Sequence, residues 1–296
     1  MSGKTERSYC RVQVFDSHVH IVVPEWLSPQ AVASMSSLAP DFARRLEIQA
    51  EPARLRAFLE ADGIEGAFII MSWHDLRPAG RDTNLYLAEY CRREADFFVP
   101  IAYLEPLTIP DPAELLEDLV VNYGMRGLKL HPPSGFYPND SRLYPLYAKA
   151  AELNIPVFLH IGSSTLPGMR LKYARPIYLD DVAVDFPDLT IIMIHAGRGY
   201  DYEAAFCLAR LHPNMILDIT GLPPNRLLQY FPELERLAER VLFGSDWPTF
   251  PATPGSNAAA IRNLPLAESS ITMILRENAR RLMARHNMSG SLLNFS

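Results

Sequence analysis

Short apolar runs alternate with amphipathic stretches along almost the whole chain. The runs are rich in Val, Ile, Leu and Phe and have the length of strands, so they predict strands that are buried on both faces. The stretches between them carry apolar residues at helical spacing, and some begin with a helix-capping residue, as at Asp111 before Pro112. The predicted strands are residues 12–20, 64–71, 97–104, 125–131, 155–161, 189–195, 215–219 and 241–246. The predicted helices are residues 51–61, 84–95, 112–122, 141–153, 176–186, 200–211, 227–239 and 268–285.

Strands that alternate with helices in this way predict a parallel sheet whose faces are covered by the helices. A chain of 296 residues suits one (β/α)8 barrel, or TIM barrel, whose usual size is about 250 residues. A doubly wound open sheet is the alternative. No linker divides the chain, so we expect a single domain, 1–296, with a core at about 12–285 and a mobile tail at 286–296. Residues 21–50, which contain three prolines, predict a long irregular loop of the kind that often covers a site.

Two histidines, His18 and His20, stand at the end of the first predicted strand, in the sequence Asp-Ser-His-Val-His. Side chains at positions i and i+2 of a strand point to the same face, so the two imidazoles should project together. Such a pair can supply two ligands to a metal ion. By itself the pair is a weak signal, because many histidine pairs lie on surfaces or in cores.

Polar residues follow most of the other predicted strands, where barrel enzymes place their chemistry. Six of the eight histidines occupy a predicted strand end or the turn beyond it. Each of these residues also has an ordinary structural explanation, such as capping a turn, but those explanations must then hold at the same end of successive strands. The residues are His18, His20, Trp73, His74, Tyr103, Glu105, Lys129, His131, His160, His195, Asp218 and Asp246.

One divalent metal ion explains this set economically. Imidazole nitrogens and a carboxylate oxygen are the ligands that zinc prefers, and a catalytic zinc site keeps one position open. The expected ligands are His18, His20, His160 and Asp246. His195 would then lie near the substrate as a general acid or base, with Asp246 as its partner in moving protons. We expect the ion to be zinc, with manganese as the alternative. We expect one ion in the site, and a second ion is the alternative.

The same residues resemble the amidohydrolase superfamily. The resemblance rests on Asp-Ser-His-Val-His at 16–20, Phe-Leu-His at 158–160, Ile-His-Ala-Gly at 194–197 and Leu-Phe-Gly-Ser-Asp-Trp-Pro at 242–248, and it covers about residues 15–282. The chain is most similar to the amidohydrolase-related branch that includes aminocarboxymuconate-semialdehyde decarboxylase. The resemblance implies a distorted barrel with one divalent metal ion, the four ligands named above, and His195 as a base or as a ligand of a second ion.

Members of this branch either hydrolyse bonds or decarboxylate aromatic and unsaturated acids. Several of its decarboxylases carry Glu at the position of His18, so the sequence favours a metal-dependent hydrolase of a small amide, ester or lactone. A cofactor-free, metal-dependent decarboxylase is the alternative, and a non-catalytic binding barrel is a third and weaker one. Oligomers are common in this branch, so the resemblance is compatible with a homo-oligomer.

Further residues are candidates for the substrate or for a second ion. Lys129 and His131 share a strand face, and in binuclear members of the superfamily a lysine on the fourth strand becomes a carbamate that bridges two ions. We favour the simpler role, in which Lys129 pairs with a carboxylate or anchors the substrate. Substrate contacts are also expected from Arg198 and Arg175, whose forks suit a carboxylate, and from Trp73 and His74.

Charge and cysteine content limit the partners. Lys and Arg number 28 against 34 Asp and Glu, and the net charge of −6 argues against a nucleic-acid or anionic-membrane surface. Cys10, Cys91 and Cys207 are scattered, which fits a reducing compartment, and no apolar run is long enough to span a bilayer. The N-terminal segment lacks the apolar stretch of a signal peptide. We therefore expect a soluble, cytoplasmic protein that acts on a small molecule.

Overall fold

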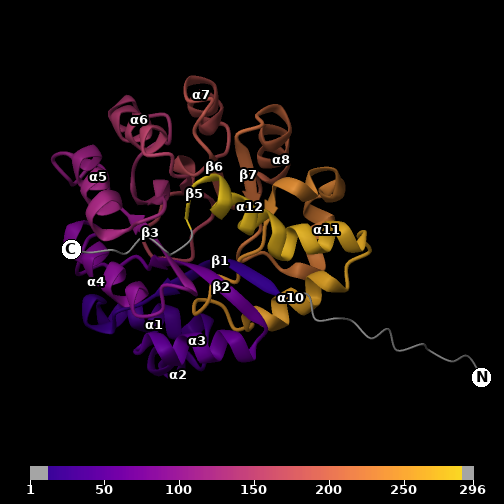
Figure 1. Ribbon diagram of the computed structural model, residues 1–296, viewed down its shortest axis with the longest axis horizontal. Helices are drawn as coiled ribbons and strands as arrows, with labels where there is room; N and C mark the ends of the chain where they lie inside the picture. The colour runs from indigo at the N-terminus through magenta and orange to yellow at the C-terminus, as the bar shows by residue number, and fades with distance from the viewer. Residues whose placement is uncertain (1–12, 289–296) are drawn as a thin grey trace, which may run out of the picture.

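The computed structural model describes residues 13–288, and these form a (β/α)8 barrel. The parallel strands pair in sequence order from β1 to β8, which is the order of a barrel and not that of a doubly wound sheet. Helices surround the strands on the outside (Figure 1). All of the predicted strands are confirmed. The strands are β1 Val14–Ile21, β2 Ile64–Met71, β3 Phe98–Tyr103, β4 Leu128–Leu130, β5 Val157–Gly162, β6 Ile191–Arg198, β7 Met215–Asp218 and β8 Val241–Leu242.

The barrel closes between β1 and the segment that follows β8. Strand β8 itself is only two residues long. Beyond it, Ser17 N donates to Phe243 O at 2.8 Å, Asp246 N to His18 O at 3.0 Å and His20 N to Trp247 O at 2.8 Å. The seam is therefore irregular, and it lies at the end of the barrel that carries the paired histidines.

Aromatic rings fill the barrel below that end. Phe68 on β2 contacts Phe15 on β1 and Phe158 on β5, with ring centroids 4.9 and 5.7 Å apart. All three side chains are buried. Because this layer excludes water from below, polar groups above it can reach solvent only through the carboxyl ends of the strands.

The described helices are α1 Pro29–Leu38, α2 Phe42–Gln49, α3 Pro52–Ala61, α4 Arg81–Arg92, α5 Pro112–Tyr123, α6 Tyr144–Glu152, α7 Tyr178–Asp185, α8 Tyr202–Leu211, α9 Leu227–Tyr230, α10 Pro254–Arg262, α11 Glu268–Thr272 and α12 Asn278–Arg285. Every predicted helix has a counterpart, although 227–239 contains only the short α9 followed by a 3-10 helix, Leu234–Arg240. The last predicted helix is a single rod in which a π-helical turn joins α11 and α12. Helix α10 was not predicted, although Thr253 before Pro254 is a helix start.

The expectation of an irregular loop at 21–50 was wrong, because the segment contains α1 and α2. Ser28 caps α1 by accepting a hydrogen bond from Ala31 N, and Pro29 occupies the first turn, where it costs no hydrogen bond. The two helices and the chain before them share a small core of their own, separate from the barrel core. That core contains Val22, Leu27, Ala31, Met35, Ala39 and Phe42.

The expectation of a tail from 286 onward was also wrong at its start. His286 is buried, its Nδ1 lies 2.9 Å from Asn154 O and its Nε2 3.0 Å from Thr190 Oγ1. Met288 is buried as well. The rest of the predicted tail, 289–296, lies outside the described residues, as do the first residue of the predicted strand at 12–20 and Cys10.

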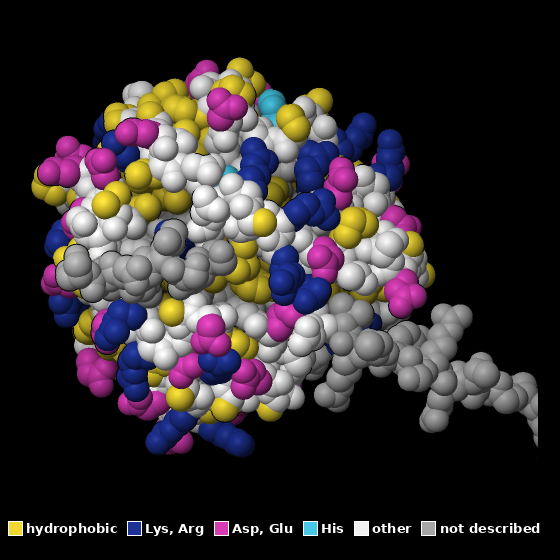
Figure 2. All heavy atoms as spheres, in the orientation of Figure 1, with side chains coloured by type: hydrophobic (Ala, Val, Ile, Leu, Met, Phe, Trp, Pro, Cys, Tyr) yellow, Lys and Arg dark blue, Asp and Glu magenta, His cyan; other side chains and the backbone are white. Residues whose placement is uncertain are grey.

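No helix among residues 13–288 combines the length and the apolar character needed to cross a membrane. Within the same residues, Cys91 is buried, Cys207 is exposed, and neither forms a disulfide. On the face drawn in Figure 2, acidic and basic side chains lie side by side over much of the surface.

Candidate metal centre and active site

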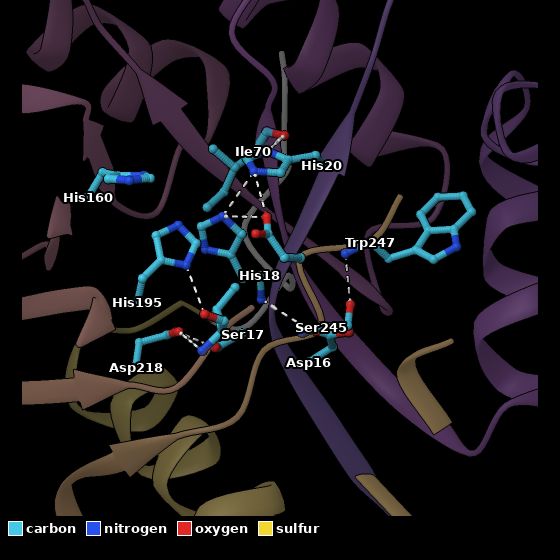
Figure 3. Close-up of polar contacts among 12 residues, drawn as sticks. Asp16, Ser17, His18, His20, Ile70, His160, His195, Asp218, Ser245 and Trp247 are labelled. Carbon is cyan, nitrogen blue, oxygen red and sulfur yellow. Dashed lines mark hydrogen bonds and ion pairs between the residues drawn. The ribbon is translucent and has the colours of Figure 1, made fainter. Parts of the chain in front are cut away.

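His18, His20 and Asp246 converge at the seam of the barrel. His18 Nε2 lies 3.1 Å from His20 Nε2, and Asp246 Oδ1 lies 3.2 Å from His20 Nε2 and 3.8 Å from His18 Nε2. Figure 3 shows the ring of His20 above that of His18, with Ser17 below both. Among the described residues these three form a group whose ligand atoms all lie within 4.8 Å of one another. The predicted i, i+2 geometry of the histidines is confirmed.

The second nitrogen of His20 fixes its orientation. Nδ1 donates a hydrogen bond to Ile70 O at 3.3 Å, which leaves the lone pair of Nε2 directed at the group. Burial, followed by the charges of Lys129 and His20, lowers the pKa of His18 well below its usual value. The His18 ring is therefore neutral near pH 7, and a neutral imidazole is the form that binds a metal.

Asp16 holds the two sides of the seam together. Its Oδ1 accepts hydrogen bonds from His18 N at 3.1 Å and from Ser245 N at 2.9 Å, so one carboxylate fixes the backbone beside two of the three clustered residues. Burial raises the pKa of Asp16 to about 7. Gly244 leaves the space that this arrangement needs, because a Cβ there would overlap Thr220 Oγ1 and lie 2.7 Å from His18 Cβ.

Two residues of the site have a left-handed backbone. The φ angles of His195 and Asp246 are 66° and 61°, a region that residues other than glycine rarely adopt. Such conformations cost on the order of 1–3 kcal/mol each and gather at functional sites. For Asp246, burial raises the pKa, but the contact with His20 and the charges of Arg198 and Lys129 outweigh it, so the pKa of the carboxyl group lies below its usual value.

His195 lies at the carboxyl end of β6, next to the clustered residues. Its Nδ1 donates to Thr220 O at 2.8 Å, because a carbonyl can only accept, and its Nε2 therefore carries the lone pair. Burial, followed by the charge of Arg198, lowers the pKa of His195 well below its usual value. The neutral ring lies 4.3 Å from the His160 ring and 5.8 Å from the His18 ring, measured between centroids. In this state His195 accepts a proton and does not donate one.

His160, on β5, stands apart from the two paired histidines in Figure 3. Its Nε2 donates to Ser163 O at 3.2 Å, and its ring packs against those of His131 and His195. It is outside the group of three that lies within 4.8 Å. Its predicted role as the fourth ligand stays a prediction, and it requires Nδ1 to face the ion or the bond to Ser163 to break.

A pocket opens above these residues and contains several of the predicted substrate contacts. Lys129, His131, Arg198 and Trp73 all line it. Arg198 is held by Ser163 O, which accepts from its Nε at 3.0 Å and from its Nη2 at 2.6 Å, and its Nη1 lies 3.8 Å from Asp246 Oδ2.

Other predicted contacts do not reach this pocket. His74 is buried, and its Nε2 accepts a hydrogen bond from Val23 N at 3.0 Å. Arg175 pairs with Asp201 at 3.2 Å, and its side chain is about half exposed. Neither lines the pocket, so the geometry gives His74 and Arg175 structural partners only.

The segment at 21–50 was predicted to be a loop of the kind that covers a site; part of it does line the pocket, but as helix α1, which was not predicted. Ser34, Met35 and Leu38 of α1 line the pocket from above, together with residues 164–166 of the loop after β5. The signal was present in the sequence: Ala31, Met35 and Leu38 are spaced i, i+4 and i+7, and Ser28 before Pro29 is a helix start. The prolines of the segment indicated a loop and not a helix.

Comparisons with known proteins identify the family of the chain. The family model described as amidohydrolase matches residues 15–284. A gamma-resorcylate decarboxylase of Rhizobium sp. (strain MTP-10005) is 27% identical over 324 residues, which cover 89% of this chain and 95% of that protein.

Solved structures share the fold. A 2,6-dihydroxybenzoate decarboxylase from Rhizobium is 22% identical with a TM-score of 0.69, over 92% of this chain and 98% of that one. A 5-carboxyvanillate decarboxylase from Novosphingobium aromaticivorans DSM 12444, complexed with manganese, is 16% identical with a TM-score of 0.70, over 92% and 96% of the two chains. The match of the family model across nearly all of the barrel, including His18, His20, His195 and Asp246, places this chain in the amidohydrolase family.

Proposed function

We propose that this protein is a metal-dependent decarboxylase of a small aromatic or unsaturated carboxylic acid. The relative that aligns over most of the chain is named as a decarboxylase, and so are two enzymes that share its fold. Decarboxylation was the alternative prediction from the sequence. Hydrolysis of an amide, ester or lactone, which the sequence favoured, has less support because those relatives carry out another reaction.

The residues at the seam fit a divalent metal ion. Two imidazole nitrogens and one carboxylate oxygen within 4.8 Å form a donor set that both zinc and manganese accept. His18, His20 and Asp246 would hold the ion, with His160 proposed as the fourth ligand. The manganese in the related structure favours manganese here. When bound, the ion supplies a Lewis acid that withdraws electron density from oxygen atoms of the substrate.

The observation that carries the proposal is the position of Arg198. Two of its nitrogens are fixed on Ser163 O, while the buried Nη1 forms no hydrogen bond within residues 13–288. This nitrogen lies beside Asp246, and Arg198 is one of the residues that line the pocket. A guanidinium held in this way is suited to bind a carboxylate next to the ion.

His195 is suited to move the proton that decarboxylation requires. With Nδ1 bonded to Thr220, its Nε2 takes the proton of a hydroxyl group beside the substrate carboxylate, and the oxyanion pushes electrons into the ring. The imidazolium then gives that proton to the ring carbon that carries the carboxylate. The bond between this carbon and the carboxylate breaks, its electron pair returns to the ring and oxygen, and CO2 leaves. A solvent proton restores the hydroxyl group.

The test is a product analysis of the manganese-loaded protein in deuterated water. Hydroxybenzoates are the substrate panel, with lactones and amides as the alternative panel. We expect release of CO2 and one deuterium at the carbon that lost it. His195→Asn should lower the rate about a hundredfold or more. His212→Asn, which changes a histidine that pairs with Asp180 away from the pocket, is the matched control.

Two results would refute the proposal. One is an unchanged rate of CO2 release in His195→Asn. The other is turnover of a lactone or amide with solvent oxygen in the product and no CO2 from any acid, which would restore the hydrolase.

A further inference from the structure

The wall of the pocket formed by β3 and β4 carries three polar side chains, those of Tyr103, Lys129 and His131. Tyr103 and Lys129 are register partners on the adjacent strands, and Lys129 and His131 share a face because they are two residues apart. All three line the pocket, and their exposed fractions are 2%, 3% and 5%. In the strand order β4 lies opposite β8, so this wall faces the seam that carries Asp246.

None of the three satisfies its polar atoms within the described part of the chain. Tyr103 Oη, Lys129 Nζ and His131 Nδ1 are buried and have no hydrogen-bond partner among residues 13–288. Folded proteins rarely leave buried polar atoms unpaired, because each then loses its hydration without compensation. Other buried tyrosines here are satisfied: Tyr90 Oη donates to Gln49 O and Tyr147 Oη to Pro138 O, both at 2.8 Å. Tyr103 therefore differs from these two tyrosines, since its hydroxyl group is unpaired and the residue lines the pocket.

The amine of Lys129, whose pKa burial lowers to about 7, also calls for an oxygen ligand. Its charge contributes to lowering the pKa of His18, His131, His160 and His195, which places its amine among these rings. Arg198 adds a second cation to the same pocket. Asp218, the buried carboxylate on β7, is already engaged by Ser17 Oγ and Thr220 N. The carboxylate of Asp246 already contacts the two paired histidines and Arg198.

We infer that Tyr103 and Lys129, with His131 beside them, form a second subsite that binds an oxygen substituent of the substrate other than the carboxylate held near Arg198. The inference rests on the proposed function and narrows its substrate class. The substrate is an acid that carries at least one further hydroxyl or anionic oxygen far enough from the first group to reach β3 and β4. Lys129 and Tyr103 donate the hydrogen bonds, so they determine specificity.

The test compares two ligands that differ by one hydroxyl group, 2-hydroxybenzoate and 2,6-dihydroxybenzoate. Their affinities for the manganese-loaded protein are measured by calorimetry, with Tyr103→Phe and Lys129→Met as variants and Tyr147→Phe as the control. We expect the protein to prefer the dihydroxy acid by about tenfold, or 1.4 kcal/mol. Each variant should lose most of this preference and bind 2-hydroxybenzoate within about twofold of the unaltered protein, while Tyr147→Phe keeps the preference.

Three outcomes would overturn the subsite: no preference in the unaltered protein, a preference retained in both variants, or an equal loss of affinity for both ligands. Metal content provides a further check. If Lys129→Met loses a second ion that the unaltered protein binds, Lys129 is a metal ligand through a carbamate and the inference is wrong. If the preference and its loss are observed but no acid releases CO2, the subsite stands and the proposed decarboxylation fails.

Discussion

Protonation of His74 should loosen the chain that covers the site. His74 Nε2 accepts the hydrogen bond from Val23 N, on the segment between β1 and α1, and only the neutral ring can do so. Burial, followed by the charge of His20, lowers the pKa of His74 from 6.5 to about 4. The folded protein therefore binds this proton more weakly than the unfolded chain does.

The sign and size of the effect follow from proton linkage. Between pH 6.5 and pH 4 the unfolded chain carries more of this proton, so the contribution of His74 is complete above pH 6.5 and is lost as the pH falls. At pH 5 the two pKa values predict a loss of about 2 kcal/mol, and at pH 4 and below the loss approaches about 3 kcal/mol.

The assay is urea unfolding at pH 7 and pH 5, for the unaltered protein and for His74→Gln, whose side chain can accept the same hydrogen bond without titrating. The unaltered protein should lose about 2 kcal/mol more than the variant between these pH values. His74→Phe serves as the control: it should be less stable at both pH values, because Val23 N is left unpaired, and should share the weaker pH dependence. Equal pH dependence in the unaltered protein and His74→Gln would refute the reasoning.

Three further predictions concern the seam, the cover and the metal. Gly244→Ala should destabilise the protein by about 3 kcal/mol and weaken metal binding, because the new Cβ overlaps Thr220. Calorimetric unfolding and a manganese titration test this prediction, and an unchanged stability together with an unchanged manganese affinity would contradict it. Arg45, on α2, donates to Phe250 O at 2.5 Å and to Pro251 O at 2.6 Å, so Arg45→Met should cost about 3 kcal/mol and speed amide exchange in α1 and α2. Exchange no faster than in the unaltered protein would show that these bonds do not hold the cover. Manganese at a hundred times its Kd should stabilise the protein by about 2.7 kcal/mol, and a chelator should reverse the shift in Tm. His20→Ala should abolish the shift, and a shift that persists in this variant would place the ion elsewhere.

Much of the barrel could be predicted from the sequence because strand burial leaves a direct trace in composition. Runs such as 64–71 and 189–195 are apolar on both faces, and this occurs when a parallel sheet is covered on both sides. Strand order then follows from connections that run from each strand to its neighbour in the barrel. Helices α1 and α2 were missed because Pro24, Pro29 and Pro40 indicate a loop, whereas Pro29 in fact occupies the first turn of a helix.

Residues two apart on one strand were the easiest part of the site to predict. His18 and His20 face the same way because of strand geometry alone, and the structure confirms it. Asp246 joined them through the position of its strand end. The distances between Asp246 and the two histidines depend on its left-handed backbone and on Asp16. The carboxylate of Asp16 bonds across the seam to Ser245, 229 residues away in the sequence.

The sequence by itself determined the fold, the family and the identity of the polar residues at the barrel mouth, because these depend on local pattern and on residue order. Only the tertiary structure decided what each residue faces. In the structure, His74 accepts a hydrogen bond from the backbone of Val23, and Arg175 pairs with the carboxylate of Asp201. Lys129 Nζ and Tyr103 Oη have no hydrogen-bond partner among residues 13–288. A side chain's partner and its pKa depend on burial and on neighbours from distant strands, and no single stretch of sequence records either.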